Sequence, residues 1–155
     1  MSNTLDNICK IRDLITIGDY KKILSGLGLF RSTYSLVNRN IERFIKNDGH
    51  NLDFTSDDLL EMSREVKVFL SNLNHQINAN KMINEITSLE QINDQTVHDF
   101  TYKYADIFTM VAHLTEFHNI ISYSASLLKV LEIQYTQGEL DFVVIDAIKK
   151  ALSVS

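Results

Sequence analysis

The fold is decided by residues 94–137, DQTVHDFTYKYADIFTMVAHLTEFHNIISYSASLLKVLEIQYTQ. Apolar residues recur there in steps of three and four, with one step of seven, which places them on one face of an α-helix. They are Val97, Phe100, Tyr104, Ile107, Val111, Leu114, Ile121, Ala125 and Leu128. No Gly or Pro interrupts the stretch, and Gly138 follows it as a stop signal. We therefore expect a central helix, capped by Asp94, against which the rest of the chain packs.

A continuous helix over residues 94–137 would be too long to fit within a compact domain. At 1.5 Å per residue, a continuous helix would be about 66 Å long, more than the diameter of a compact domain of this chain length. The helix must therefore either break, with the Asn- and Ser-rich residues 118–124 as the expected place, or project from the bundle. A projecting apolar seam would need a partner, most simply a second copy, so we expect a homodimer.

Turn and capping residues divide the rest of the chain into further helices. Gly18 ends a first helix, and Asp19 is a good cap for the next. Residues 25–28 include two glycines and predict a kink or a fresh start, while Thr55 and Asp58 have the spacing of a capping box. We expect helices over residues 4–17, 20–46, 55–80, 88–93 and 139–152. The fold class is thus an all-α, single-domain bundle of five or six helices.

Composition agrees with this architecture. The 155 residues contain no proline and only five glycines, and 45% of them are apolar. The single cysteine, Cys9, lies beside isoleucines and is expected to behave as a small buried hydrophobe. One cysteine, no signal-peptide pattern and no long apolar run predict a cytoplasmic protein that does not enter a membrane.

Charge is distributed unevenly along the chain. The net charge is −5, yet residues 1–50 carry eight Lys or Arg and only five Asp or Glu. An acidic chain is not typical of a general nucleic-acid binder. The only compact basic group is Arg39, Arg43 and Lys46, on one side of the helix expected over residues 20–46. We therefore expect these three side chains to bind an acidic protein partner.

Histidines and carboxylates offer little support for metal or acid–base chemistry. His113 and His118 are five residues apart, so they do not share a helix face as two zinc ligands would. One is expected to be a core histidine and the other a surface histidine. Carboxylates recur along the His113 side of the central helix, as in a solvated outer face. No serine or cysteine lies in a nucleophile motif, and we expect no metal and no cofactor.

One short motif suggests an alternative. Arg43 and His50 bracket six residues, RFIKNDGH, which resembles the R-x4-6-H motif of HEPN-family ribonucleases. Those enzymes are helical bundles, often dimeric, in which the Arg and His meet in a composite site. The resemblance implies that Arg43 binds the scissile phosphate and that His50 transfers a proton. In this sequence Phe44 stands where a polar residue commonly follows the Arg.

Two hypotheses of function follow. The first is a non-catalytic interaction factor of the adaptor, inhibitor, immunity or chaperone type, from a bacterium, phage or mobile element as the abundance of Asn and Ile suggests. The second is a metal-independent, HEPN-like ribonuclease that uses Arg43 and His50.

Overall fold

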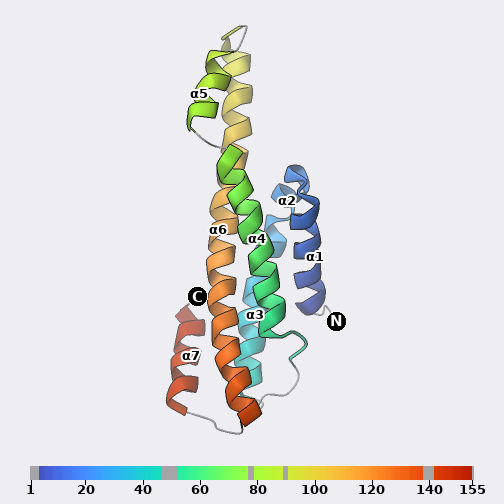
Figure 1. Ribbon diagram of the computed structural model, residues 1–155, viewed down its shortest axis with the longest axis vertical. Coiled ribbons are helices and arrows are strands. Elements are labelled where there is room, and N and C mark those ends of the chain that lie inside the picture. Colours follow the sequence, from blue (N-terminus) through green and yellow to red (C-terminus); the bar gives the residue numbers. More distant parts are fainter. Residues whose placement is uncertain (1–3, 47–51, 77–78, 89–90, 138–141, 155) are drawn as a thin grey trace.

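The computed structural model describes residues 4–46, 52–76, 79–88, 91–137 and 142–154, and these form seven helices and no strand (Figure 1). The all-α bundle expected from the sequence is thereby confirmed. The helices are α1 (Thr4–Ile17), α2 (Tyr20–Ser25), α3 (Leu27–Lys46), α4 (Ser56–Gln76), α5 (Ala79–Thr87), α6 (Asp94–Gln137) and α7 (Phe142–Val154). No described helix combines the length with the apolar content that crossing a bilayer requires.

Helix α6 is the spine of the bundle and runs unbroken through residues 118–124. The serines in this segment do not interrupt it because their hydroxyls find partners. Ser122 shares a hydrogen bond of 2.5 Å with Ser63 of α4, and Ser124 donates one of 2.7 Å to the side chain of Asn38 in α3. The Ser126 hydroxyl donates to the Ser122 carbonyl within the helix. Of the two expected outcomes, projection rather than breakage is therefore the correct one.

The core lies where α3 and α4 pack on α6. Figure 1 shows α1, α2 and α3 on one side of α6 and α7 on the other, beside the C-terminal half of α6. The α6 residues buried in this core are Tyr104, Ile107, Met110, Leu114, Phe117, Ile121, Ala125, Leu128 and Leu131. Met110 and Phe117 were not in the expected stripe, whereas Val97 was expected in it and is exposed. Helices α3 and α4 both pack extensively on α6, so its buried face is wider than one stripe.

Two glycines shape the N-terminal helices. Gly18 has a φ of 71° and ends α1, and the Asp19 carboxylate then accepts hydrogen bonds from the first amides of α2. Gly26 ends α2, where its amide hydrogen-bonds to the Lys22 and Ile23 carbonyls, and its own carbonyl accepts from Leu29 of α3. A Cβ on Gly26 would lie 3.4 Å from the Leu14 side chain, so α1 approaches closely here. The fresh start expected at residues 25–28 is confirmed.

The start of α4 follows the capping box. The Thr55 amide donates to the Asp58 carboxylate over 2.8 Å, and the Asp58 amide donates back to the Thr55 hydroxyl over 3.3 Å. Phe54 is buried against the core just before this cap. The Ser56 amide and hydroxyl both donate to the carboxylate of Glu132, which ties the first turn of α4 to α6.

Three sequence predictions were wrong in detail in the segment that precedes α6. The short helix expected over residues 88–93 is instead α5, which ends at Thr87. The Ser88 hydroxyl donates to the Asn84 carbonyl at this end, so Ser88 closes α5 and does not begin a helix. Asn93 caps α6 in place of Asp94: the Thr96 amide donates to Asn93 and the Asn93 amide donates to Thr96.

Helix α7 completes the bundle. Its described residues begin at Phe142, so the expected start at Glu139 lies outside the described residues, and the β-prone run from Phe142 to Ile145 is helical. Ile145, Ile148 and Leu152 are buried, while Ala147 is exposed. Packing against α3 and α6 thus overrides the β-propensity of this run. The expected stop at Gly138 lies outside the described residues.

Candidate partner-binding surface

The basic residues predicted to bind a partner lie in the C-terminal half of α3. Arg39, Arg43 and Lys46 are all exposed, while Ile41 and Phe44 of the same helix are buried in the core. This helix is strongly amphipathic, so the residues that hold it to the bundle leave its basic side in solvent. The three side chains therefore form one accessible surface, which we call the α3 basic surface.

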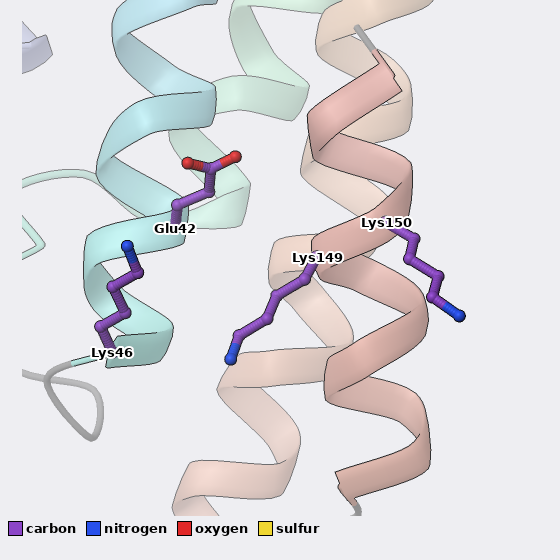
Figure 2. Close-up of a pocket in the computed structure, with 4 residues that line it drawn as sticks. All are labelled: Glu42, Lys46, Lys149 and Lys150. Atoms are coloured by element: carbon purple, nitrogen blue, oxygen red, sulfur yellow. The ribbon is translucent and has the colours of Figure 1, made fainter.

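A pocket of about 330 Å³ lies beside the α3 basic surface, between α3 and α7. Its described lining consists of Glu42, Lys46, Lys149 and Lys150. Figure 2 shows Glu42 and Lys149 extending into the gap between the two helices, whereas Lys150 extends away from α3. Helix α7 thus adds a second source of positive charge next to Lys46. Lys149 could not be predicted as part of this surface from the sequence, because only the packing of α7 on α3 brings it there.

Positive charge on the α3 basic surface is largely uncompensated. Arg39, Arg43 and Lys46 make no ion pair with any described residue, unlike Arg12, whose guanidinium lies 2.8 Å from Glu61. Glu42 is the only carboxylate in the described lining of the pocket. An exposed cluster of cations on a protein of net charge −5 attracts anionic groups of a partner and repels basic ones.

Of the two residues that resemble the HEPN motif, Arg43 and His50, the structure describes only Arg43. Arg43 is exposed in the last turn of α3, with its charge toward solvent. His50 lies outside the described residues, so the structure does not place it relative to Arg43. Phe44, which occupies the position of the family's usual polar residue, is buried in the core.

Histidines of α6 do not assemble a catalytic or metal site in the described part of the chain. No group of three or more His, Cys, Asp or Glu residues there could hold a metal ion. His113 and His118 are both half-buried, so the expected division into one core and one surface histidine was wrong. Nε2 of His118 lies 3.5 Å from the Ser122 hydroxyl, which pairs with Ser63. No described carboxylate hydrogen-bonds to His118 or His113, as a catalytic triad would require.

Cys9 is half-buried rather than fully buried. Its Sγ lies 3.8 Å from a guanidinium nitrogen of Arg12, one turn along α1. That arginine is also paired with Glu61 of α4. The contact makes the surroundings of the thiol more polar than a purely apolar core position.

A polar cluster of Glu85, Lys103 and Tyr104 joins α5 to α6. The Glu85 carboxylate accepts hydrogen bonds from Lys103, over 2.8 Å, and from the hydroxyl of Tyr104. Donation by Lys103 first, and by Tyr104 second, lowers the pKa of Glu85. The same hydrogen bonds to Glu85 raise the pKa of the Lys103 ammonium and of the Tyr104 hydroxyl. The cluster stabilises α5 on the spine and was missed because Glu85 and Lys103 lie on separate helices.

Comparison with protein-family models, with curated proteins and with solved structures finds no match to this chain.

Proposed function

We propose that this protein is a non-catalytic interaction factor, of the adaptor, inhibitor, immunity or chaperone type, of a bacterium, phage or mobile element. Its α3 basic surface binds an acidic surface of a partner protein in the cytoplasm. The partner presents carboxylates to Arg39, Arg43 and Lys46, and the pocket beside Lys149 receives one side chain of that partner. No cofactor takes part.

The observation that carries this proposal is the accessibility of the basic side chains. Arg39, Arg43 and Lys46 are exposed together on one helix and form no ion pair with a described residue. Arginine is favoured at protein interfaces because its planar guanidinium donates two parallel hydrogen bonds to a carboxylate. Rim charges of this kind mainly raise the association rate and select the partner.

Charge reversal tests the proposal. A tagged chain should capture one stoichiometric protein from lysate of the source cells. The triple variant Arg39→Glu, Arg43→Glu, Lys46→Glu should lose most of it, because a tenfold loss of affinity removes up to about nine-tenths of the captured protein. The matched control is Lys21→Glu, Lys22→Glu, Arg31→Glu, which changes three exposed basic residues by the same total charge. Equal capture by the two triple variants would reject the α3 basic surface as the binding site.

RNA cleavage tests the alternative function. We expect the purified chain to leave RNA intact in the absence of metal. Cleavage that is lost in both Arg43→Ala and His50→Ala would instead establish the HEPN-like ribonuclease and overturn the non-catalytic proposal.

Self-association is a further part of the proposal. We infer that the chain forms a homodimer, because the N-terminal end of α6 extends beyond α1, α2 and α3 (Figure 1). Light scattering should give twice the chain mass of 17.8 kDa.

A further inference from the structure

One side of α6, which α3, α4 and α7 all leave exposed, carries a ladder of uncharged residues. They follow one another in steps of four and three along a single strip of the helix, which is the spacing of a helix-pairing seam. The ladder consists of Thr101, Ala105, Phe108, Ala112, Thr115, Asn119, Tyr123, Ser126, Val130 and Ile133. All ten side chains are exposed. We call this strip the α6 outer ladder.

Its composition is unusual for a solvated helix face. The outer face of a bundle helix normally carries Lys, Glu, Asp or Arg, yet the α6 outer ladder has no charged residue. Four of its large apolar side chains are 40–54% exposed: Phe108, Tyr123, Val130 and Ile133. Consequently α6 as a whole is only weakly amphipathic, as is typical of a helix covered on both sides.

Sizes along the ladder are complementary in one antiparallel arrangement. If two copies of α6 pack antiparallel about a two-fold axis near residue 117, residues whose numbers add to 234 or 235 face each other. This arrangement sets every large apolar side chain of the ladder opposite a smaller one of the partner copy. The facing pairs are Phe108 with Ser126, Tyr123 with Ala112, Val130 with Ala105 and Ile133 with Thr101.

The centre of this arrangement is polar. Thr115 faces Asn119 of the other copy on each side of the axis, so each hydroxyl can donate to a facing amide oxygen. A single polar layer of this kind fixes the register of paired helices. A shift by one heptad places Phe108 opposite Asn119 and leaves Val130 and Ile133 without ladder partners, so the centred register is favoured.

We propose that a second copy of this chain covers the α6 outer ladder, antiparallel and in this register. The inference depends on the homodimer proposed above and specifies its contact surface. The ladder is about 48 Å long and a helix is about 12 Å wide, so the two copies together cover about 1,200 Å². This lies at the lower end of specific protein interfaces. An isologous contact also needs no charge complementarity, in agreement with the uncharged ladder.

A single charge at the centre of the ladder tests the surface. Ala112→Glu adds a carboxylate that would be buried against Tyr123 of the second copy, so we expect light scattering to fall from twice the chain mass to 17.8 kDa. Ala and Glu both favour helix, and Ala112 is exposed, so the circular dichroism spectrum should be unchanged. The matched control is Ala147→Glu, at an exposed position of α7, which should remain dimeric.

Cross-linking tests the direction and the register. In a Cys9→Ser background, the double variant Ala105→Cys, Val130→Cys should give a covalent dimer with a short bis-maleimide reagent, confirmed by mass spectrometry. These two positions are about 37 Å apart along one α6, so the reagent cannot join them within a chain. Each single variant should stay uncross-linked, because its two copies lie equally far apart in the dimer.

Each of three results would overturn a different part of the inference. A monomeric wild-type chain at high concentration would reject both the homodimer and its surface. A dimer that survives Ala112→Glu would reject the α6 outer ladder and leave the homodimer standing. Cross-linking by Ala105→Cys alone would reject the antiparallel arrangement. None of these results bears on the capture experiment with the α3 basic surface.

Discussion

Gly18 and Gly28 are close in sequence, but only at Gly18 does the backbone conformation disfavour a residue that has a Cβ. Gly18 adopts a φ of 71°, in the left-handed region, where a Cβ is unfavourable. Gly28 lies within α3, and a Cβ added there would meet nothing within 4 Å. The first glycine is needed by the turn between α1 and α2, and the second only adds freedom to the unfolded chain.

Alanine substitution should therefore change stability in opposite directions at these two positions. We expect Gly18→Ala to lower the free energy of unfolding by about 1 kcal/mol. Gly28→Ala should raise it by up to about 1 kcal/mol, because alanine favours the helix. Urea denaturation followed by circular dichroism measures both. Equal destabilisation by Gly18→Ala and Gly28→Ala would contradict the inference that the turn needs Gly18 whereas α3 does not need Gly28.

Single residues of the chain differ in how well sequence predicts them. The Asp19 cap and the Thr55–Asp58 capping box were predictable because their partners are backbone amides within three residues. The partners of Ser124 and of Glu132 were not, because Asn38 and Ser56 are distant in sequence. Local hydrogen bonds follow from spacing, whereas long-range ones require the packed fold.

Whole helices also differ in how well sequence predicts them, according to whether local pattern or tertiary packing determines them. Helix α6 was predicted with its bounds because a 3.6-residue period over many turns is a strong signal. Helix α5 was misplaced because its stretch is rich in Asn, whose side chain competes for backbone hydrogen bonds. Its Glu85 contacts with Lys103 and Tyr104 stabilise it through tertiary packing that no local pattern encodes. In the same way, Lys149 joined the candidate surface only through the docking of α7.

Acid should loosen α5 from α6. The pKa of Glu85 is lowered in the folded state, so the carboxylate contributes stability above its unfolded pKa and loses it as pH falls through the folded pKa. We expect the protection factors of α5 amides, which are corrected for the intrinsic effect of pH on exchange, to be smaller below that pH than at neutral pH, while those of amides at the centre of α6 do not change. Because the pair is partly exposed, its contribution is below about 1 kcal/mol.

A matched variant assigns this pH effect to Glu85. Glu85→Gln keeps the size of the side chain and removes its titration, so the protection factors of α5 amides should be smaller at neutral pH and nearly independent of acid. Unchanged acid sensitivity in Glu85→Gln would show that other carboxylates control the release of α5.

The two ends of the molecule differ in how many side chains of α6 they bury. From Tyr104 to Leu131, α6 buries side chains at nearly every turn against α3 and α4. The residues before Tyr104 are mostly exposed, and this end of α6 extends beyond α1, α2 and α3 (Figure 1). Local stability follows the density of buried contacts, so the two ends should open with different free energies.

Hydrogen exchange should therefore show a gradient along a single helix. We expect amides of residues 107–131 to be protected close to the global limit, and amides of residues 97–103 to exchange at least tenfold faster. Leu114→Ala, a fully buried site, should lower the global limit by about 2–5 kcal/mol. Uniform protection over the whole helix would contradict this division.

The unbroken α6 has a consequence for hydrodynamics. A rod of about 66 Å gives a chain of 17.8 kDa a larger frictional coefficient than a sphere of equal mass. On a gel-filtration column calibrated with spherical standards, even one copy would therefore elute early and imitate a heavier species. Sedimentation velocity separates the two cases, because an elongated single chain sediments slowly, whereas a true pair sediments faster for its added mass.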